Sequence, residues 1–247
     1  MLRKVAALVS LSLLAACTSG PPRVPIKVID RALASAGTTG LAQPGQIVAI
    51  ESGFARTARE QGQWSAFTQY AAPDAVLHLP SGLVPAAEWL RGRANPAETI
   101  RWAVRDVWMS CDSTLAGSQG RYRDANGLVG NYVTAWRRQS DNSYRWTYHA
   151  SAPDQPQPPP RPEQARGEDE IVVLAMELIR GHVADCKGRP ADPGPQTNPA
   201  PLVKASAPDG TLYWLAQQRE DGVRRFIVLS NKDGAWDEVL DIGFNPG

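Results

Sequence analysis

The chain has 247 residues, of which 43% are hydrophobic, and its 26 basic and 25 acidic side chains give a formal net charge of +1. This balance argues against the broad basic surface that nucleic-acid binding requires, and there is no polyanionic tail. The length suits one large domain, or a domain with a smaller unit attached.

The first 16 residues have the layout of a secretory signal peptide. Met1 to Lys4 is basic, and Val5 to Ala16 is an apolar run that only two serines interrupt. That run is shorter than the ~20 apolar residues needed to cross a bilayer. Leu14-Ala-Ala-Cys17 resembles the bacterial lipobox, which implies cleavage before Cys17 and lipidation of that cysteine. An ordinary cleaved signal with a chance cysteine is the alternative.

The resemblance to a lipobox also implies where the protein is located in the cell. Thr18 follows the cysteine, where lipoproteins kept at the inner membrane usually have aspartate. We therefore expect a lipid-anchored protein of the bacterial envelope, at the periplasmic face of the outer membrane. Residues 17–43 are rich in Gly, Ser, Thr and Pro and are predicted to be a tether.

Helical spacing begins at Pro44, a residue that a first helical turn tolerates. Apolar residues then recur every three or four positions, at Ile47, Ile50, Phe54 and Ala58. Gly62 interrupts the pattern, which continues through Trp64, Phe67 and Ala71. A third, short helix is predicted over Pro85–Leu90.

The spacing also indicates strands. Ala75–Leu79 is predicted to be a strand, and from Ile100 the apolar period becomes two. A four-strand meander is predicted over residues 100–108, 115–122, 128–138 and 144–148. On its first strand Ile100, Trp102, Val104 and Trp108 share one face, which Asp106 breaks, either as pocket polarity or as a bulge. Helices followed by a meander predict an α+β domain over 44–150, with three N-terminal helices on a curved antiparallel sheet.

The remaining residues read as a linker and a small β unit. Residues 151–170 form a proline-rich linker. Ile171–Ala184 is ambiguous between helix and strand, with a strand favoured for at least Ile179–Cys186. Asp-Gly pairs at 209, 221 and 233 predict hairpin turns. Residues 171–247 are therefore predicted to be a C-terminal β-rich extension, with a three-stranded meander that must pack on the main domain.

Two cysteines remain after Cys17. In an oxidising compartment Cys111 and Cys186 are expected to form a disulfide, and two separate buried thiols are an equal alternative. The sequence has no CxxC pair and only three histidines, so no metal site is expected.

Residues 44–150 resemble the nuclear transport factor 2-like superfamily, which includes SnoaL-like cyclases and ketosteroid isomerases. The resemblance rests on FARTAREQGQWSAFTQYAAPDAVLHLP, STLAGSQGRY and GNYVTAWRRQSDNSYRW. It implies a cone of helices against a bent sheet, enclosing a mostly apolar pocket. It also implies that two copies could pair through the outer face of the sheet.

Alternation on the first strand sets the expected lining of that pocket. Ala75, Leu77 and Leu79 would face the cone, whereas Val76 and His78 would point away. The pocket-lining residues so expected are Leu77, Leu79, Trp102, Tyr132, Trp136 and Trp146.

The resemblance also locates the ketosteroid isomerase machinery. Its base would fall at Leu79 and its tyrosine near Ala55, so neither group is present. His78, Asp74 and Asp106 are weak candidates, and no catalytic residue is assigned. The preferred hypothesis is an envelope lipoprotein that binds a small apolar ligand or a protein partner, without catalysis or cofactor. The alternative is a SnoaL-like isomerase, cyclase or lyase, which ionisable pocket groups with shifted pKa values would favour.

Overall fold

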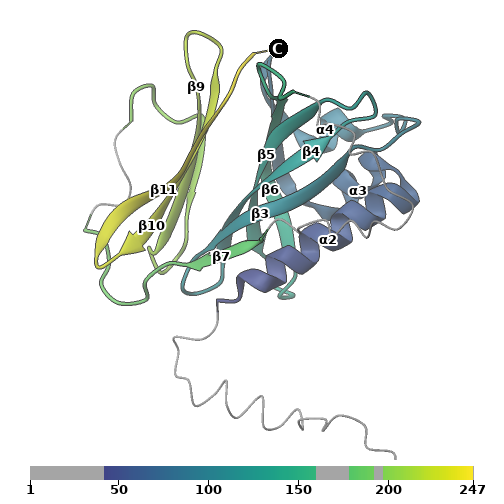
Figure 1. Ribbon diagram of the computed structural model, residues 1–247. Coiled ribbons are helices and arrows are strands. Elements are labelled where there is room, and N and C mark those ends of the chain that lie inside the picture. Colours follow the sequence, from purple (N-terminus) through teal and green to yellow (C-terminus); the bar gives the residue numbers. More distant parts are fainter. Residues whose placement is uncertain (1–41, 160–177, 192–196, 247) are drawn as a thin grey trace, which may run out of the picture. The chain divides into compact units, whose positions relative to one another are not determined.

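The computed structural model describes residues 42–159, 178–191 and 197–246 (Figure 1). The signal peptide, Cys17, nearly all of the tether, residues 160–170 of the linker and residues 171–177 of the ambiguous segment lie outside the described residues. Within those ranges, no helix combines the length and the apolar character that crossing a membrane requires.

Three helices precede or interrupt the first strands, as the sequence predicts. Helix α2 spans Pro44–Gln61, α3 spans Gln63–Tyr70 and α4 spans Ala86–Leu90. Gly62 separates α2 from α3 with a φ of 98°, which is a backbone conformation that glycine adopts without strain.

A seven-stranded sheet packs against these helices. Its strands, in spatial order, are β2 (Gly82–Pro85), β1 (Ala71–Leu79), β6 (Tyr144–Pro153), β5 (Val129–Arg138), β4 (Leu115–Arg123), β3 (Arg101–Met109) and β7 (Arg180–Val183). Neighbours are antiparallel except for β1 with β6 and β3 with β7. This confirms the predicted α+β class and the antiparallel-dominated sheet.

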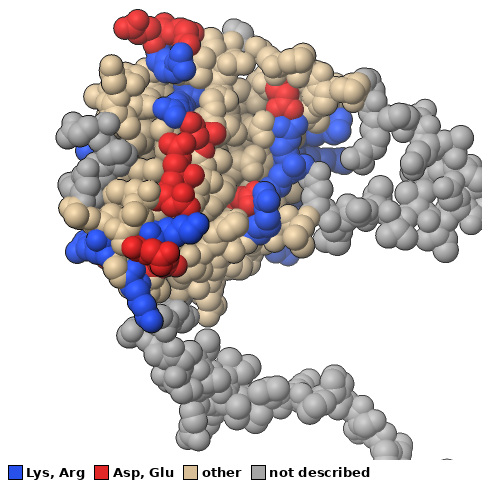
Figure 2. Space-filling model, turned by 60° about the vertical axis from the view of Figure 1, so that its left-hand side comes forward, with Lys and Arg blue, Asp and Glu red and all other residues tan. Residues whose placement is uncertain are grey.

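A second sheet covers the other face. It contains β11 (Ala235–Phe244), β10 (Arg224–Lys232), β9 (Leu212–Gln218) and β8 (Val203–Ser206), in that order. The predicted meander thus has four strands rather than three, because β8 pairs with β9. Figure 2 shows a stripe of acidic side chains with basic ones beside it, and the edge strand β11 carries Asp237, Glu238 and Asp241. Charge on an edge strand opposes pairing with another chain.

The two sheets share an apolar core. Tyr148 of β6 stacks on Phe226 of β10 with ring centroids 5.1 Å apart, and Trp214 packs beside both. Arg224, 2% exposed, donates to the backbone carbonyls of His78 and Ser151. The resemblance implied a homodimer contact on this face, and in this chain the second sheet packs there.

Two bulges change which side chains face the cone. A register shift between Val104 and Asp106 turns Trp108 toward the second sheet, so Trp108 does not share a face with Trp102. The bulge reading of Asp106 is thus confirmed. A second register shift lies in β6, between Trp146 and Tyr148, which pair with Trp136 and Ala135 of β5. As a result Trp146 faces the cone, whereas Tyr148 faces the second sheet. A bulge inserts one residue and inverts the alternation that follows it.

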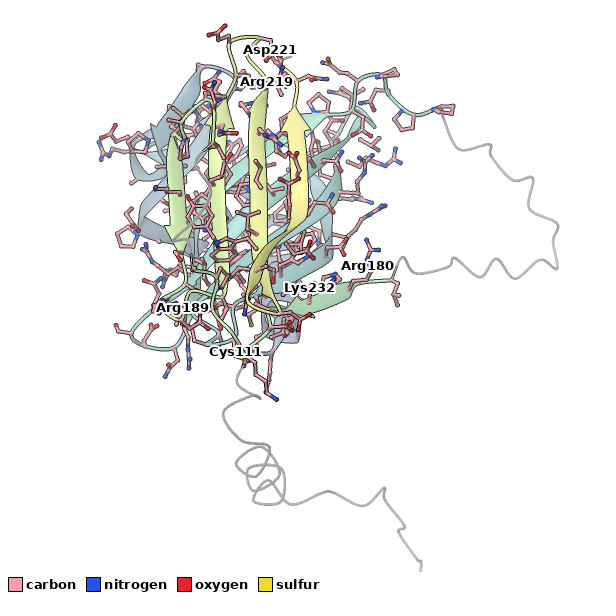
Figure 3. The ribbon with its side chains drawn as sticks, turned by 90° about the vertical axis from the view of Figure 1, so that its left-hand side faces the viewer. Cys111, Arg180, Arg189, Arg219, Asp221 and Lys232 are labelled. Carbon is pink, nitrogen blue, oxygen red and sulfur yellow. A yellow bond between two sulfur atoms is a disulfide. The ribbon has the colours of Figure 1, made fainter. Side chains whose placement is uncertain are left out.

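Strand β7 joins the main sheet to the C-terminal unit. It covers only Arg180–Val183 of the strand expected over Ile179–Cys186. Asp106 pairs with Arg180 at 2.8 Å, and His182 stacks on Trp108. Cys111 and Cys186 form a disulfide just beyond. Figure 3 shows Cys111 and Lys232 at one end of the second sheet, with Arg219 and Asp221 at the opposite end.

Candidate functional site

A small cavity lies inside the cone, between the helices and the concave side of the sheet. Its volume is ≈ 10 Å³, about enough for one water molecule. Apolar and aromatic side chains form much of its wall. The side chains that bring a carboxyl, hydroxyl or imidazole group to the cavity are Glu51, Tyr122, Tyr132, Thr134, His149 and Ser151.

Glu51 is the acidic group of this cavity. It lies on the buried face of α2, between Ile47 and Ala55, and is only 2% exposed. The Ser118 hydroxyl is 2.6 Å from its Oε1, and the Tyr132 hydroxyl donates to its Oε2 at 3.3 Å. Burial raises the pKa of Glu51, and these hydrogen bonds oppose the rise only in part. Glu51 therefore stays a neutral carboxylic acid at pH values above those at which a glutamate usually ionises.

Tyr132 is held in place by two features of the sheet. Its ring lies over Gly120, its cross-strand partner, where an added Cβ would come 2.5 Å from the ring. Its hydroxyl reaches Glu51, and burial together with the charge of Glu51 raises its pKa well above the usual value. Tyr132 is thus a neutral hydrogen-bond donor fixed beside a carboxyl group.

His149 adds a neutral imidazole to the same cavity. Its Nδ1 is 3.0 Å from the Thr134 hydroxyl, and its ring stacks on that of Tyr132. Burial, with a smaller contribution from the charge of Arg224, lowers the pKa of His149 to about 3. A neutral imidazole offers one donor and one acceptor nitrogen.

Together these groups form a polar tip in an aromatic pocket. The neutral carboxylic acid and the neutral imidazole can each donate a hydrogen bond to a carbonyl or hydroxyl oxygen of a ligand, while the Tyr132 hydroxyl orients the carboxyl group by donating to it. In the described part of the chain, no three His, Cys, Asp or Glu side chains lie close enough to hold a metal ion.

Of the six pocket residues predicted from the sequence, two line the cavity and four lie in the core around it. Trp102 and Tyr132 line the cavity. Leu77 and Trp146 are buried in the surrounding core, and Leu79 packs against it. Trp136 acts on the cavity indirectly, because its Nε1 donates to Ser118 Oγ at 3.0 Å.

The three candidate catalytic groups weighed from the sequence lie elsewhere. His78 points away from the cone, as alternation predicts, and its Nδ1 is 2.8 Å from the Tyr148 hydroxyl between the sheets. Asp74 pairs with Arg137 at 2.6 Å at the surface. Asp106 binds Arg180 and His182. Among the lining residues given above, none of these three appears.

Sequence reasoning missed Glu51 and His149. The signal for Glu51 was present, since it sits four residues after Ile47 and four before Ala55, inside an apolar helical stripe. His149 carried no such signal, because the strand faces invert at the bulge before it.

Comparisons with known proteins give fold-level similarity only. No family model and no curated protein matches the chain. Several solved structures are similar to part of it, among them the following three. A ketosteroid isomerase-like protein from Erwinia carotovora atroseptica is 14% identical, with 43% of this chain and 92% of that one covered and a TM-score of 0.34. An NTF2-like protein of unknown function from Mesorhizobium loti is 15% identical, with 46% and 94% covered and a TM-score of 0.31.

The third is a protein of unknown function with a cystatin-like fold from Methylobium petroleophilum. It is 12% identical, with 50% of this chain and 84% of that chain covered and a TM-score of 0.33. Similarity at this level transfers no residue role to this chain.

Proposed function

We propose that this chain is a lipid-anchored protein of the bacterial envelope whose cone domain, of the nuclear transport factor 2-like kind, binds a small and mostly apolar molecule. The observation that carries the proposal is the buried Glu51 carboxyl group, which meets the Tyr132 hydroxyl at an aromatic-lined cavity.

Core packing alone is a poor explanation for Glu51. A buried carboxyl group costs free energy even when it is hydrogen-bonded, and a well-packed apolar side chain of similar size is often as stable or more so. Glu51 nevertheless has partners at both of its oxygens, supplied by β4 and β5. Groups arranged this way suit recognition of one polar atom on an otherwise apolar ligand.

The size of the cavity sets a condition on binding. A volume of ≈ 10 Å³ admits no organic ligand, so side chains must move when one enters. Trp102 and Tyr122 line both the cavity and an outer groove of ≈ 530 Å³. Rotation of these two rings would join the two spaces and supply the entry route.

Native mass spectrometry of the purified chain tests this proposal, through the mass of any co-purifying small molecule. Glu51→Leu should abolish retention of that molecule, whereas the exposed Glu60→Gln should not. Retention by Glu51→Leu at the wild-type level would reject the cavity as the binding site.

A second function, general acid catalysis, is favoured by one observation. Glu51 and Tyr132 lie within hydrogen-bond reach and both have raised pKa values, which is typical of catalytic sites. The test is exchange of the α-protons of a bound carbonyl ligand in D₂O, followed by NMR. In this exchange the Glu51–Tyr132 pair donates to the carbonyl oxygen, solvent water accepts the α-proton, and the enol then takes up a deuteron from D₂O. Exchange that requires Glu51 and Tyr132 supports catalysis, and its absence leaves binding as the function.

The lipid anchor is tested separately. Cys17→Ser should prevent incorporation of labelled palmitate and leave the precursor unprocessed. Normal labelling or maturation of that variant would reject the lipobox.

A further inference from the structure

A second polar feature lies outside the cone, where the ladder of β3 and β4 ends. A groove of ≈ 530 Å³ is lined there by Arg101, Arg105, Arg121 and Arg123. Among the lining residues that the structure describes, none is acidic. The groove therefore concentrates positive charge on a chain whose formal net charge is only +1.

Two of these arginines face each other directly. Arg101 and Arg123 are cross-strand partners, forming the outermost pair of the ladder, and both are exposed. Directly opposed like charges destabilise a strand pair. An anion bound between them would remove that repulsion.

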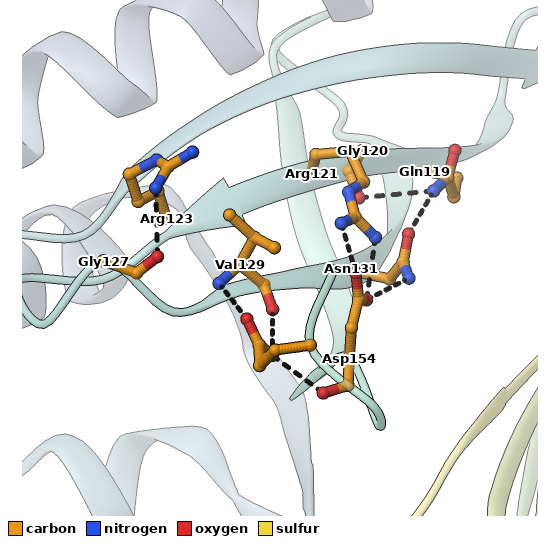
Figure 4. Close-up of polar contacts among 9 residues, drawn as sticks. Gln119, Gly120, Arg121, Arg123, Gly127, Val129, Asn131 and Asp154 are labelled. Carbon is orange, nitrogen blue, oxygen red and sulfur yellow. Dashed lines mark hydrogen bonds and ion pairs between the residues drawn. The ribbon is translucent and has the colours of Figure 1, made fainter. Parts of the chain in front are cut away.

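A third arginine is held rigidly by its neighbours. Arg121 forms a two-point ion pair with Asp154, whose carboxylate also accepts from Asn131 at 3.0 Å (Figure 4). Asn131 in turn accepts from Gln119. Asp154 offsets the charge of Arg121, so this network fixes the wall of the groove while Arg101 and Arg123 supply the charge. Arg123 is steadied by the Gly127 carbonyl at 3.0 Å.

The groove also adjoins the entrance to the cone. Trp102 and Tyr122 are cross-strand partners one position from the Arg101–Arg123 pair, and they line both spaces. Guanidinium groups bind carboxylate or phosphate through two parallel hydrogen bonds. Aromatic rings alongside them provide a surface for an apolar group.

We infer that the groove binds the anionic group of a small amphipathic organic acid, whose apolar part lies against Trp102 and Tyr122 and extends into the cone. This inference rests on the proposed function and specifies its ligand class. The ligand is a molecule with one anionic end and an aromatic or aliphatic body.

Calorimetric titration of the full chain with two matched probes tests the inference. The probes are 4-phenylbutyrate and its neutral amide, 4-phenylbutyramide. A charged hydrogen-bonded pair contributes enough that the carboxylate should bind at least about tenfold more tightly than the amide. The double variant Arg101→Gln/Arg123→Gln should remove this preference without lowering the melting temperature. The exposed Arg56→Gln on α2 serves as the control and should keep the preference.

Two results would overturn the inference. The first is equal binding of the two probes. The second is a preference that the double variant retains.

The outcomes also separate this inference from the proposed function. Equal binding of both probes that Glu51→Gln weakens would overturn the anion site and leave the cone as a ligand site. Binding of neither probe would also overturn the anion site, and the proposed function would then be judged by the co-purifying molecule.

Discussion

The Tyr132 hydroxyl donates to Oε2 of Glu51 at 3.3 Å and thereby links the sheet to helix α2 across the cone. Each group alters the other. The charge that Glu51 would carry raises the pKa of Tyr132, and burial of both favours their neutral forms. The pair is thus a neutral hydrogen-bonding unit, and its consequences are measurable as pH dependence.

Glu51→Gln should change how stability depends on pH. The folded-state pKa of Glu51 is above its usual 4.5, so its contribution to stability is fully present below pH 4.5. As pH rises above 4.5 the unfolded chain ionises first, and the free energy of unfolding falls by up to about 1.4 kcal/mol per pH unit until the folded pKa is passed. Glutamine does not ionise, so the variant should lack this decline.

Urea denaturation between pH 4 and 8 measures the effect. The exposed Glu60→Gln provides a matched loss of one carboxyl group outside the core. Parallel curves for wild type and Glu51→Gln would mean that Glu51 is ionised in the folded protein, against the role assigned to it.

Gly120→Ala should disturb the site through Tyr132. The new Cβ would lie 2.3 Å from the Ala103 carbonyl oxygen and 2.5 Å from the Tyr132 ring. Because one neighbour is backbone, the strands and the ring must shift, at a cost of about 1–3 kcal/mol. We expect lower stability and weaker ligand retention. Gly45→Ala, which meets nothing within 4 Å, should be harmless, and a wild-type melting temperature for Gly120→Ala would contradict the packing of Tyr132.

His149 should make the fold sensitive to acid. Its pKa is lowered to about 3 in the folded state, so its contribution is complete above pH 6.5 and is lost as pH falls from 6.5 toward 3. His78, whose pKa is lowered to about 4 by burial, acts in the same direction. His149→Asn and His78→Asn should each flatten the acid limb of the stability curve. If the limb keeps its wild-type slope in the double variant, neither histidine is neutral by burial.

Much of the architecture could be predicted because periodicity reports burial. Apolar spacing of three and four located α2 and α3, a short apolar run located β1, and alternation located β3 to β6. Asp-Gly turns marked the second sheet, but the linker predicted from residue 151 begins inside β6, which runs to Pro153. Two strands were omitted, β2 in the main sheet and β8 in the second, and each has only four residues, too few for alternation to show.

The site was harder to predict for two physical reasons. A bulge inverts the faces of a strand through a local register shift that alternation cannot reveal, so His149 enters the cone instead of Tyr148. A helical stripe is defined by its apolar members, so Glu51 was passed over although its position lies within the stripe. Buried polar residues depend on partners from distant strands, here Ser118 and Tyr132, and sequence spacing does not locate those partners.

The second sheet is fastened to the main sheet by a few identifiable links, of which the Cys111–Cys186 disulfide should contribute most. Its closed loop spans 75 residues, and chain entropy predicts about 4 kcal/mol of stabilisation for that size. Other contacts remain when it is removed. Asn231 donates to the backbone carbonyls of Asp185, Lys187 and Gly188, and Cys111 donates its N–H to Thr211.

Cys186→Ala should therefore fold with both sheets but unfold at lower urea, with the free energy of unfolding reduced by about 4 kcal/mol. Reductant should lower the stability of the wild type to the level of the variant and leave the variant unchanged. Alkylation of the unfolded protein, with peptide mapping by mass, should find no free thiol at either position without reductant. Two free thiols there, or a wild-type free energy of unfolding that is the same with and without reductant, would show that packing around Tyr148 and Phe226 holds the second sheet by itself.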